Sequence, residues 1–379
     1  MKVKLNEIFE KPISGEWGTE LEDGQNGVNV IRTTNFTNLG RLYLEDVVQR
    51  KIDIDKYKNK ILKYGDIIIE KSGGSPSQPV GRVVIFEEND EIYFCNNFTS
   101  ILRPTKLINS KYSLYLMKDL YKKGKVLKYQ NKTTGIINLK LADYLNNIDV
   151  ILPTINNQIK IANVLDKSQE LIDKRKEQIE VLDELIKSKF IEMFGDPVIN
   201  PKGWKCEELK NVTLKITDGK HGDCENEENS GYYFISAKDI NDRKIYTENS
   251  RQITKKDFDE TNKRTMLKAG DIIVVNTGAT IGKTAIATIE DVSKNLTFQK
   301  SVAIITVDSD KLLSEFLEQY IIFDRDRIYN NASGSAQKNW LLSQMRSYKI
   351  ILPPVELQTK FVNFVREVDK LKLKWEKIN

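Results

Sequence analysis

The sequence contains few of the residues that carry most enzyme chemistry and most structural cross-links. Of its 379 residues, only one is histidine and three are cysteine. Cys95, Cys206 and Cys224 are odd in number, and no two of them have the C-x-x-C spacing of a metal site. This usage argues against a disulfide framework and is typical of reduced thiols in a cytoplasm. We therefore expect a cytoplasmic protein with no metal site on this chain.

Long apolar runs are also missing from the sequence. No run approaches the length that a bilayer-spanning helix needs, and residues 1–7 lack the apolar core of a signal peptide. Hydrophobic residues make up 40% and charged residues 30%, which is the composition of a soluble globular protein. We expect no membrane partner.

The charge balance is only weakly basic. The formal net charge is +5 and the pI is about 8.7. Such a balance produces no strong basic field over the whole protein, but it permits a nucleic-acid partner where Lys and Arg are clustered. A length of 379 residues predicts two domains of ordinary size.

The chain contains an internal repeat. Three blocks occur twice, in the same order and about 200 residues apart, and repeats of this kind decide the architecture of a chain. The paired blocks are residues 28–33 and 232–237, 61–69 and 266–274, and 150–153 and 350–353. The last pair is followed by Gln158, Lys160 and Asn163 in one copy and by Gln358, Lys360 and Asn363 in the other. The chain is therefore two diverged copies of one unit.

Each copy begins with a stretch typical of a mixed α/β domain. Short β-branched and aromatic runs, separated by Gly, Asn and Asp, predict strands. These runs are residues 67–70, 82–86, 98–102, 232–235, 271–275 and 301–307. An apolar stripe at three- and four-residue spacing predicts helices over 110–121 and 311–322.

A long helix is predicted to follow each of these domains. Over 155–194 apolar residues recur every seven positions, and a helix of this length would measure about 60 Å. It ends at Gly195-Asp196-Pro197, a glycine stop followed by proline. A seam of this kind requires a partner helix, so we expect the two helices to pair as an antiparallel coiled coil. The predicted pairing and subunit-binding residues are Leu165, Ile172, Ile179, Leu182, Ile186, Phe361, Phe364, Val368, Leu371 and Trp375.

The predicted fold is therefore α+β: two mixed α/β domains, joined and followed by long helices, with a pseudo-two-fold repeat. The order of parts resembles the type I restriction–modification specificity subunits over essentially the whole chain. The resemblance is carried by both Gly-Asp-Ile-Ile blocks, the loop 276–283, the Leu-Pro segments before Gln158 and Gln358, and the helix end 187–197.

The resemblance implies a division of labour. Residues 1–152 and 196–352 would be target recognition domains, each reading half of a split asymmetric sequence in double-stranded DNA. Residues 153–195 would be a central spacer helix and 353–379 a distal helix, and these would bind two methyltransferase subunits and restriction subunits. S-adenosyl-L-methionine, ATP and Mg²⁺ are expected on those partner subunits and no cofactor on this chain, which would have no catalytic residues.

DNA recognition requires amide and guanidinium groups for base edges, and lysines or hydroxyls for phosphates. Polar loops after the predicted strands supply these groups in both copies. In the first copy the candidates are Lys71, Ser72, Gln78, Arg82, Lys128, Gln130, Lys132, Thr133 and Thr134. In the second copy they are Lys220, His221, Asn276, Thr277, Lys283, Gln299, Lys300, Ser335, Gln337 and Lys338. Most polar loop residues are only solvated surface, so the loops as groups carry this prediction.

Several motifs have a second interpretation. The segment 278–284 resembles a phosphate-binding loop, but it has three residues between its glycines where the nucleotide-binding pattern has four. A turn presenting Lys283 to a DNA phosphate, or a tight turn with a solvated lysine, fits it better. The first copy has no clear counterpart of this loop. Asp66 and Asp271 suit turns better than catalysis, and His221 lacks an accompanying nucleophile motif.

Two other functions remain open. One is a coiled-coil scaffold that binds only proteins, and the other is a self-contained DNA-modifying enzyme. The second is disfavoured because the sequence contains no Asn-Pro-Pro-aromatic motif of adenine methylation and no clustered acids of a nuclease site.

Overall fold

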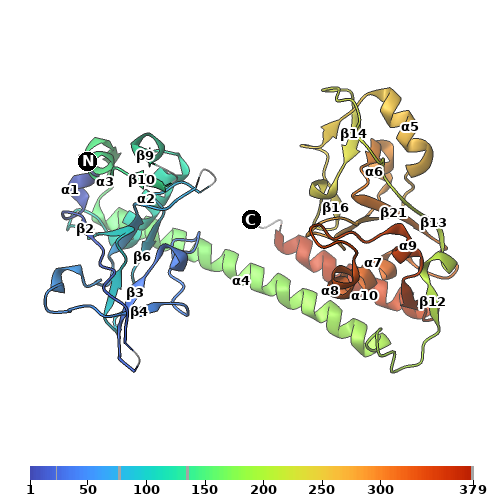
Figure 1. Ribbon diagram of the computed structural model, residues 1–379, viewed down its shortest axis with the longest axis horizontal. Helices are drawn as coiled ribbons and strands as arrows, with labels where there is room; N and C mark the ends of the chain where they lie inside the picture. Colours follow the sequence, from blue (N-terminus) through green and yellow to red (C-terminus); the bar gives the residue numbers. More distant parts are fainter. Residues whose placement is uncertain (23, 76–77, 134–135, 377–379) are drawn as a thin grey trace. The chain divides into compact units, whose positions relative to one another are not determined.

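The computed structural model describes residues 1–22, 24–75, 78–133 and 136–376. It divides the chain into two compact units, Met1–Asp173 and Lys174–Asn379. Each unit contains one mixed α/β domain and part of the long helix (Figure 1). This division does not test the domain boundaries at residues 152, 195 and 352, which stay predictions.

A four-stranded antiparallel sheet forms the centre of the first unit, with strand order β2-β8-β5-β6. Its strands are β2 (Ile13–Ser14), β5 (Ile67–Glu70), β6 (Val83–Ile85) and β8 (Thr99–Leu102). All of β5 is buried. Ile67 and Ile69 pack into one apolar cluster and Ile68 into another, and the carboxylate of Glu70 pairs with Arg82 (2.8 Å).

Smaller sheets and helices surround this sheet. Strand β3 (Val28–Ile31) pairs with β4 (Val48–Arg50) and, in parallel, with β7 (Tyr93–Cys95). The other paired strands are β1 (Lys2–Lys4) with β11 (Asp149–Ile151), and β9 (Gln130–Thr133) with β10 (Ile136–Leu139). The helices are α1 (Leu5–Ile8), α2 (Ser110–Lys122) and α3 (Leu141–Asn147).

The second unit repeats this plan. Its four-stranded sheet has the order β13-β21-β18-β19 and its three-stranded sheet the order β17-β14-β20, with β14 and β20 parallel. These strands are β13 (Thr213–Asp218), β14 (Tyr232–Ile235), β17 (Arg251–Gln252), β18 (Ile272–Val275), β19 (Thr284–Ile286), β20 (Asn295–Phe298) and β21 (Val302–Val307). The remaining strands are β12 (Cys206–Glu208), which pairs with β22 (Lys349–Ile351), and β15 (Ile240–Asn241), which pairs with β16 (Lys244–Ile245). The helices are α5 (Lys255–Thr265), α6 (Ile289–Ser293), α7 (Ser314–Phe323), α8 (Arg325–Asn331) and α9 (Leu342–Arg346).

The internal repeat is confirmed by matching strand pairings. Both units contain the same four-stranded and three-stranded arrangements, in the same chain order. Both also join the start of the domain to its end: β1 pairs with β11 and β12 with β22, antiparallel in each case. The first and last strands of each domain are therefore paired with each other, and the long helix begins directly after this pair.

The long helix α4 (Ile155–Phe194) has the bounds expected from its heptad. It ends at Gly195, whose φ of +75° is the left-handed conformation of a helix stop. In the second unit its last turns run antiparallel to α10 (Val355–Glu376): Phe190 lies 5.5 Å from Phe361, while Asp183, earlier in α4, pairs with Lys372, later in α10. The predicted antiparallel helix pair is confirmed there.

Candidate nucleic-acid interface

Four strand ends meet at one edge of the central sheet in the first unit. Strands β2 and β5 end at this edge, and β6 and β8 begin there, because neighbours in this sheet are antiparallel. Lys71 and Ser72 follow β5 and Arg82 precedes β6. The fold therefore brings the two ends of the β5–β6 loop, which carry these predicted residues, to the same edge.

The second unit presents the same edge with different residues. Lys220 follows β13, Asn276 follows β18, Lys300 precedes β21 and Lys283 precedes β19. The backbone N–H of Asn276 donates to the carbonyl of Ser301 (3.0 Å), and that of Lys300 donates to the carbonyl of Lys220 (3.1 Å). Residues from three loops, after β13, between β18 and β19, and between β20 and β21, thus form one polar surface.

A close backbone crossing shapes this edge in both units. A Cβ atom on Gly15 would lie 2.1 Å from the carbonyl oxygen of Asn96, and one on Gly219 would lie 2.0 Å from that of Phe298. Glycine is required because no side chain fits there. Gly15 and Gly219 each begin a Gly-x-x-Gly segment, Gly15–Gly18 and Gly219–Gly222. This repeated spacing in the sequence identifies Glu16 and Trp17 as further candidate interface residues, which were not among those predicted.

A second loop is attached to the same edge. The N–H of Gly73 donates to the carbonyl of Ile137 (3.0 Å), and the N–H of Gly278 donates to the carbonyl of Lys338 (2.8 Å). These bonds connect the loop after β5 or β18 to the β9–β10 hairpin in one unit and to the segment 333–339 in the other. In each repeat, the predicted residues of the loop after β5 or β18 therefore lie next to those of the β9–β10 hairpin or of the segment 333–339.

The loop before β6 does have a counterpart in the second copy, contrary to the sequence analysis. Gly81 and Gly282 have φ of +109° and +83°, and each precedes a cation at the start of a strand, Arg82 or Lys283. The spacing from Gly73 to Gly81 is eight residues and from Gly278 to Gly282 only four. The first copy thus has four extra residues in this loop, which hid the match.

The segment 278–284 is the turn of a β-hairpin. Strands β18 and β19 flank it and pair antiparallel, whereas a nucleotide-binding loop leads into a helix. The Nζ of Lys283 donates to Oδ1 of Asn241 (2.7 Å). The segment is therefore a tight turn, and nucleotide binding by a phosphate loop is excluded.

Several predicted residues have structural partners. Arg82 forms two hydrogen bonds to the buried carboxylate of Glu70 (2.8 and 3.1 Å). Lys220 pairs with Asp257 (2.9 Å), and this hydrogen bond raises the pKa of Lys220. Gln130 donates to the carbonyl of Val80 (3.2 Å). The side chains of Lys338, Ser72 and Thr277 also bond within the protein. These groups hold the loops in place.

Other predicted residues leave exposed polar groups at or near this edge. The exposed set is Gln78, Lys128, His221, Lys300, Ser335 and Gln337. Lys71 and Gln299 are half-buried and Asn276 is buried. Burial lowers the pKa of Lys71, whose Nζ donates to Oγ of Ser14 (2.6 Å). Thr134 and the side chains of Lys132 and Thr133 lie outside the described residues.

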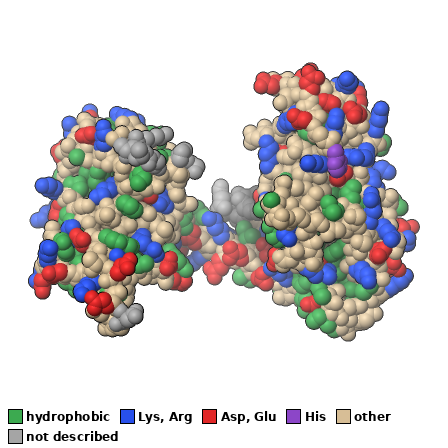
Figure 2. All heavy atoms as spheres, viewed as in Figure 1, with side chains coloured by type: hydrophobic (Ala, Val, Ile, Leu, Met, Phe, Trp, Pro, Cys, Tyr) green, Lys and Arg blue, Asp and Glu red, His purple; other side chains and the backbone are tan. Residues whose placement is uncertain are grey.

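The single histidine, purple in Figure 2, lies on the surface among Lys and Arg side chains. His221 bonds to Oδ2 of Asp218 (2.8 Å). Asp66 and Asp271 each accept a backbone N–H three residues earlier, from Lys63 (2.8 Å) and Lys268 (2.9 Å). Their interpretation as turn residues is confirmed. Within the described ranges no group of three or more His, Cys, Asp or Glu could hold a metal ion.

The helix pair is held by a stripe at four-residue spacing. Leu182, Ile186, Phe190 and Phe194 are buried against α10 and the second domain. Phe190 and Phe194 were not among the predicted pairing residues. Of those predicted, Phe361 and Val368 are also buried, Phe364 and Ile179 are half-buried, and Leu371 is exposed. Leu165 and Ile172 remain 38% and 37% exposed, and the side chain of Trp375 lies outside the described residues.

A buried glutamine in the first turn of α4, and another in the first turn of α10, connects the helix to its own domain by hydrogen bonds. Oε1 of Gln158 accepts the N–H of Asn109 (2.9 Å), at the start of α2. Its Nε2 donates to the carbonyls of Leu107 (3.1 Å) and Pro153 (3.0 Å). Gln358 makes the same three bonds, to Leu313, Lys311 and Pro353 (2.9, 3.0 and 2.9 Å). All three of these hydrogen bonds go to backbone groups in each repeat, and they fix the start of the helix on its domain.

An ion pair beside each glutamine has opposite polarity in the two repeats. In the first, Lys111 of α2 pairs with Asp166 of α4 (2.8 Å). In the second, Glu315 of α7 pairs with Arg366 of α10. Burial opposes ionisation of Asp166, but the Lys111 ammonium and the Tyr115 hydroxyl hold its pKa below the ordinary value. In each repeat, the helix of the domain therefore carries a charge opposite to that of the long helix that packs on it.

Comparison with known proteins agrees with this architecture. The family model described as "Type I restriction modification DNA specificity domain" matches residues 1–182 and 201–379. Two Methanocaldococcus jannaschii proteins, a putative type I restriction enzyme MjaX specificity subunit and the MjaVIII specificity subunit, are 26% and 23% identical to the chain. Each match covers 89% of this chain, and 77% and 80% of the relatives.

Two solved structures share the fold over the whole chain. A type I restriction–modification S subunit from M. genitalium has a TM-score of 0.55 at 14% identity, with 91% of its length covered. A chain solved in work on complex assembly and conformational transition of the type I R-M system has a TM-score of 0.56 at 15% identity, with 93% covered. The relatives are named specificity subunits, as expected for a non-catalytic recognition chain. The chain therefore belongs to the family of type I restriction–modification DNA specificity subunits.

Proposed function

We propose that each repeat reads one half of a split, asymmetric sequence in double-stranded DNA. The helices α4 and α10 would set the distance between the two readers and bind two adenine methyltransferase subunits, which restriction subunits join. S-adenosyl-L-methionine, ATP and Mg²⁺ would belong to those partners, in the cytoplasm. This chain would supply recognition and positioning only.

One observation carries the proposal: the two repeats have the same scaffold but different residues at the same sheet edge. Glu16 and Trp17 of the first repeat stand where the second has Lys220 and His221, within matching Gly-x-x-Gly segments. Lys71 and Ser72 likewise stand where the second has Asn276 and Thr277. A shared frame with divergent polar loops suits two readers of two different half-sites.

The exposed groups suggest which residues contact DNA phosphates and which contact base edges. Lys128 and Lys300 can neutralise phosphates, which supplies affinity that weakens as salt rises. Gln78 and Gln337 carry amides, which bond to adenine edges in the major groove. Arg82, held by Glu70, would support its loop rather than contact a base.

The test is methylation mapping of DNA from cells that contain the complete complex. We expect a bipartite motif with a fixed gap. Gln337→Ala should relax one half of the motif and Gln78→Ala the other, so each variant is the control for the other. A continuous motif, or both variants affecting the same half, would overturn the proposal. So would a purified complex without salt-sensitive duplex binding.

A further inference from the structure

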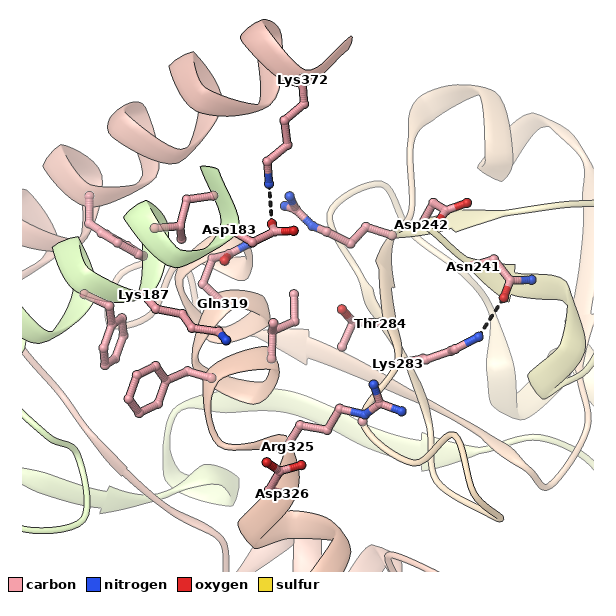
Figure 3. A pocket seen from close by; sticks show the side chains of 17 residues that line it. Asp183, Lys187, Asn241, Asp242, Lys283, Thr284, Gln319, Arg325, Asp326 and Lys372 are labelled. Atoms are coloured by element: carbon pink, nitrogen blue, oxygen red, sulfur yellow. Dashed lines mark hydrogen bonds and ion pairs between the residues drawn. The ribbon is translucent and has the colours of Figure 1, made fainter. Parts of the chain in front are cut away.

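In the second unit, the last turns of α4 pack against a surface formed by α7 and α10. We call this helix-binding surface the seat. The ring of Phe190 lies 6.0 Å from that of Phe316, 5.9 Å from Tyr320 and 5.5 Å from Phe361. Figure 3 shows the adjoining pocket of about 510 Å³, where Asp183 of α4 faces Lys372 of α10. The seat therefore receives an aromatic side chain on an amphipathic helix.

The first unit contains the equivalent surface, formed by α2 and the first turns of α4. Among the residues described in that unit, no helix packs on it. The shared hydrogen bonds of Gln158 and Gln358 align α2 with α7 and the first turns of α4 with α10. By this alignment, Tyr112 and Leu116 of α2 correspond to Phe316 and Tyr320. Ile161 and Leu165 of α4 correspond to Phe361 and Val365 in the same way. All of these corresponding residues are aromatic or aliphatic.

These seat residues remain uncovered in the first unit. Ile161 is 39% exposed where Phe361 is fully buried, and Leu165 is 38% exposed where Val365 is 2% exposed. Tyr112 is half-buried. A pocket of about 880 Å³ opens at this place, and its apolar and aromatic lining is Val83, Tyr112, Tyr115, Leu116, Tyr121 and Leu165. A contiguous apolar surface of this kind marks a binding site for a partner.

Cations border the seat. Lys118 and Lys122 of α2 line the pocket, together with Arg82 and a single acid, Asp119. Burial lowers the pKa of Lys118, and the charge of Arg41 lowers it further. A carboxylate brought in by an occupant would stabilise the ammonium group of Lys118.

We propose that this seat binds an amphipathic helix of a partner protein, with an aromatic side chain where Phe190 lies in the second unit and carboxylates facing Lys118 and Lys122. The inference rests on the subunit-binding part of the proposed function and refines it. Gln78, a proposed DNA-reading residue, also lines this pocket, but no part of the inference depends on it. The template for the occupant is the helix segment of this chain that fills the equivalent seat.

The test uses the full chain and a fluorescent peptide with the sequence of residues 178–195 and the change Glu184→Lys. A lactam bridge between the carboxylate of Glu180 and the amine introduced at position 184, both exposed positions, holds this peptide helical. We expect saturable binding by fluorescence anisotropy. A peptide with Phe190→Ala, and a chain with Leu165→Asp, should each weaken binding about tenfold or more, which is about 1.4 kcal/mol.

The matched control is Val181→Asp, which adds the same charge at an exposed position of α4 in the second unit. It should bind the peptide as the unaltered chain does, and circular dichroism should show that both variants are folded. No binding at millimolar peptide, or binding insensitive to Leu165→Asp, would overturn the inference. Because the assay contains neither DNA nor methyltransferase, a failure here leaves the DNA-reading proposal intact, and the reverse also holds.

Discussion

At the scale of single residues, two glutamines connect each mixed α/β domain to the long helix that follows it. Gln158 and Gln358 stand in the repeated sequence after Leu-Pro, and both are almost fully buried. Their amides form hydrogen bonds with backbone groups of the domain and of the segment just before the helix, which fixes the start of each helix on its domain. The repeat itself was visible in the sequence, but the bonding partners, about 50 residues earlier in the chain, were not.

Replacing Gln358 by leucine should destabilise the second unit. The N–H of Leu313 would lose its buried acceptor, and an unsatisfied buried group costs about 1–3 kcal/mol. Urea unfolding followed by circular dichroism should therefore show a lower free energy of unfolding. Gln178→Leu, at an exposed position of α4, is the control and should change the value by less than about 0.5 kcal/mol. Equal losses in both variants would contradict this account.

Gly219→Ala should be more damaging than Gly222→Ala. A Cβ on Gly219 would meet the backbone of Phe298 at 2.0 Å, so the crossing of two loops must open. At Gly222 nothing lies within 4 Å, and only the φ of +110° opposes a side chain. Thermal unfolding should show a loss of about 3 kcal/mol or more for the first and about 1 kcal/mol for the second. Similar melting temperatures would show that the crossing is not rigid.

At the scale of elements, the polarity of an ion pair distinguishes the two helix–domain contacts. Lys111–Asp166 and Glu315–Arg366 occupy matching positions with opposite signs. A helix placed on the wrong domain would bring two like charges together. The pairs are partly exposed, so each contributes only about 0.5 kcal/mol, which affects pairing preference more than stability.

Asp166→Arg alone should destabilise the first unit, because it places a second cation beside Lys111. Adding Lys111→Glu should restore part of the lost stability. It copies the pair of the second unit, but it also removes the ion pair of Lys111 with Glu87 (3.5 Å). Unfolding of the two single variants and the double variant, analysed as a cycle, should give a favourable coupling of about 1–2 kcal/mol. The cycle compares two attractive pairs, each worth about 0.5 kcal/mol, with two repulsive pairs of similar size. In the unaltered pair the folded pKa of Asp166 is lowered, so its contribution is present at neutral pH and disappears as pH falls through that lowered value. A coupling of zero at pH 7 would contradict the inference that this ion pair favours the correct pairing of helix and domain.

The helix seam was only partly predictable. The heptad predicted a long paired helix, and α4 has the expected bounds. However, the buried stripe follows four-residue steps through Phe190 and Phe194, while Leu165 and Ile172 stay exposed. Periodicity shows that a helix has an apolar face, but several surfaces can cover such a face, and only the packing selects one.

At the scale of the whole molecule, the length of α4 should determine the gap in the DNA target. Inserting four residues after Glu177 adds about 6 Å of helix, which corresponds to about one to two base pairs of B-form DNA. Methylation mapping of cells carrying this variant should show both half-sites unchanged and a longer gap. Glu177→Ala, without the insertion, should leave the gap as it is. Altered half-site sequences would contradict the role of α4 as a spacer.

The sequence alone determined the duplication, the order of domains and helices and the absence of cysteine and histidine clusters, because these depend on periodicity and composition along the chain. Tertiary structure alone decided which loops share a sheet edge, which cations are neutralised and which helix face is covered. Those properties depend on contacts between residues far apart in the sequence, as between Gly73 and Ile137 or Phe190 and Phe361. A local pattern contains no information on such distances, and the four extra residues before Gly81 show how a short insertion can hide an equivalence that the backbone preserves.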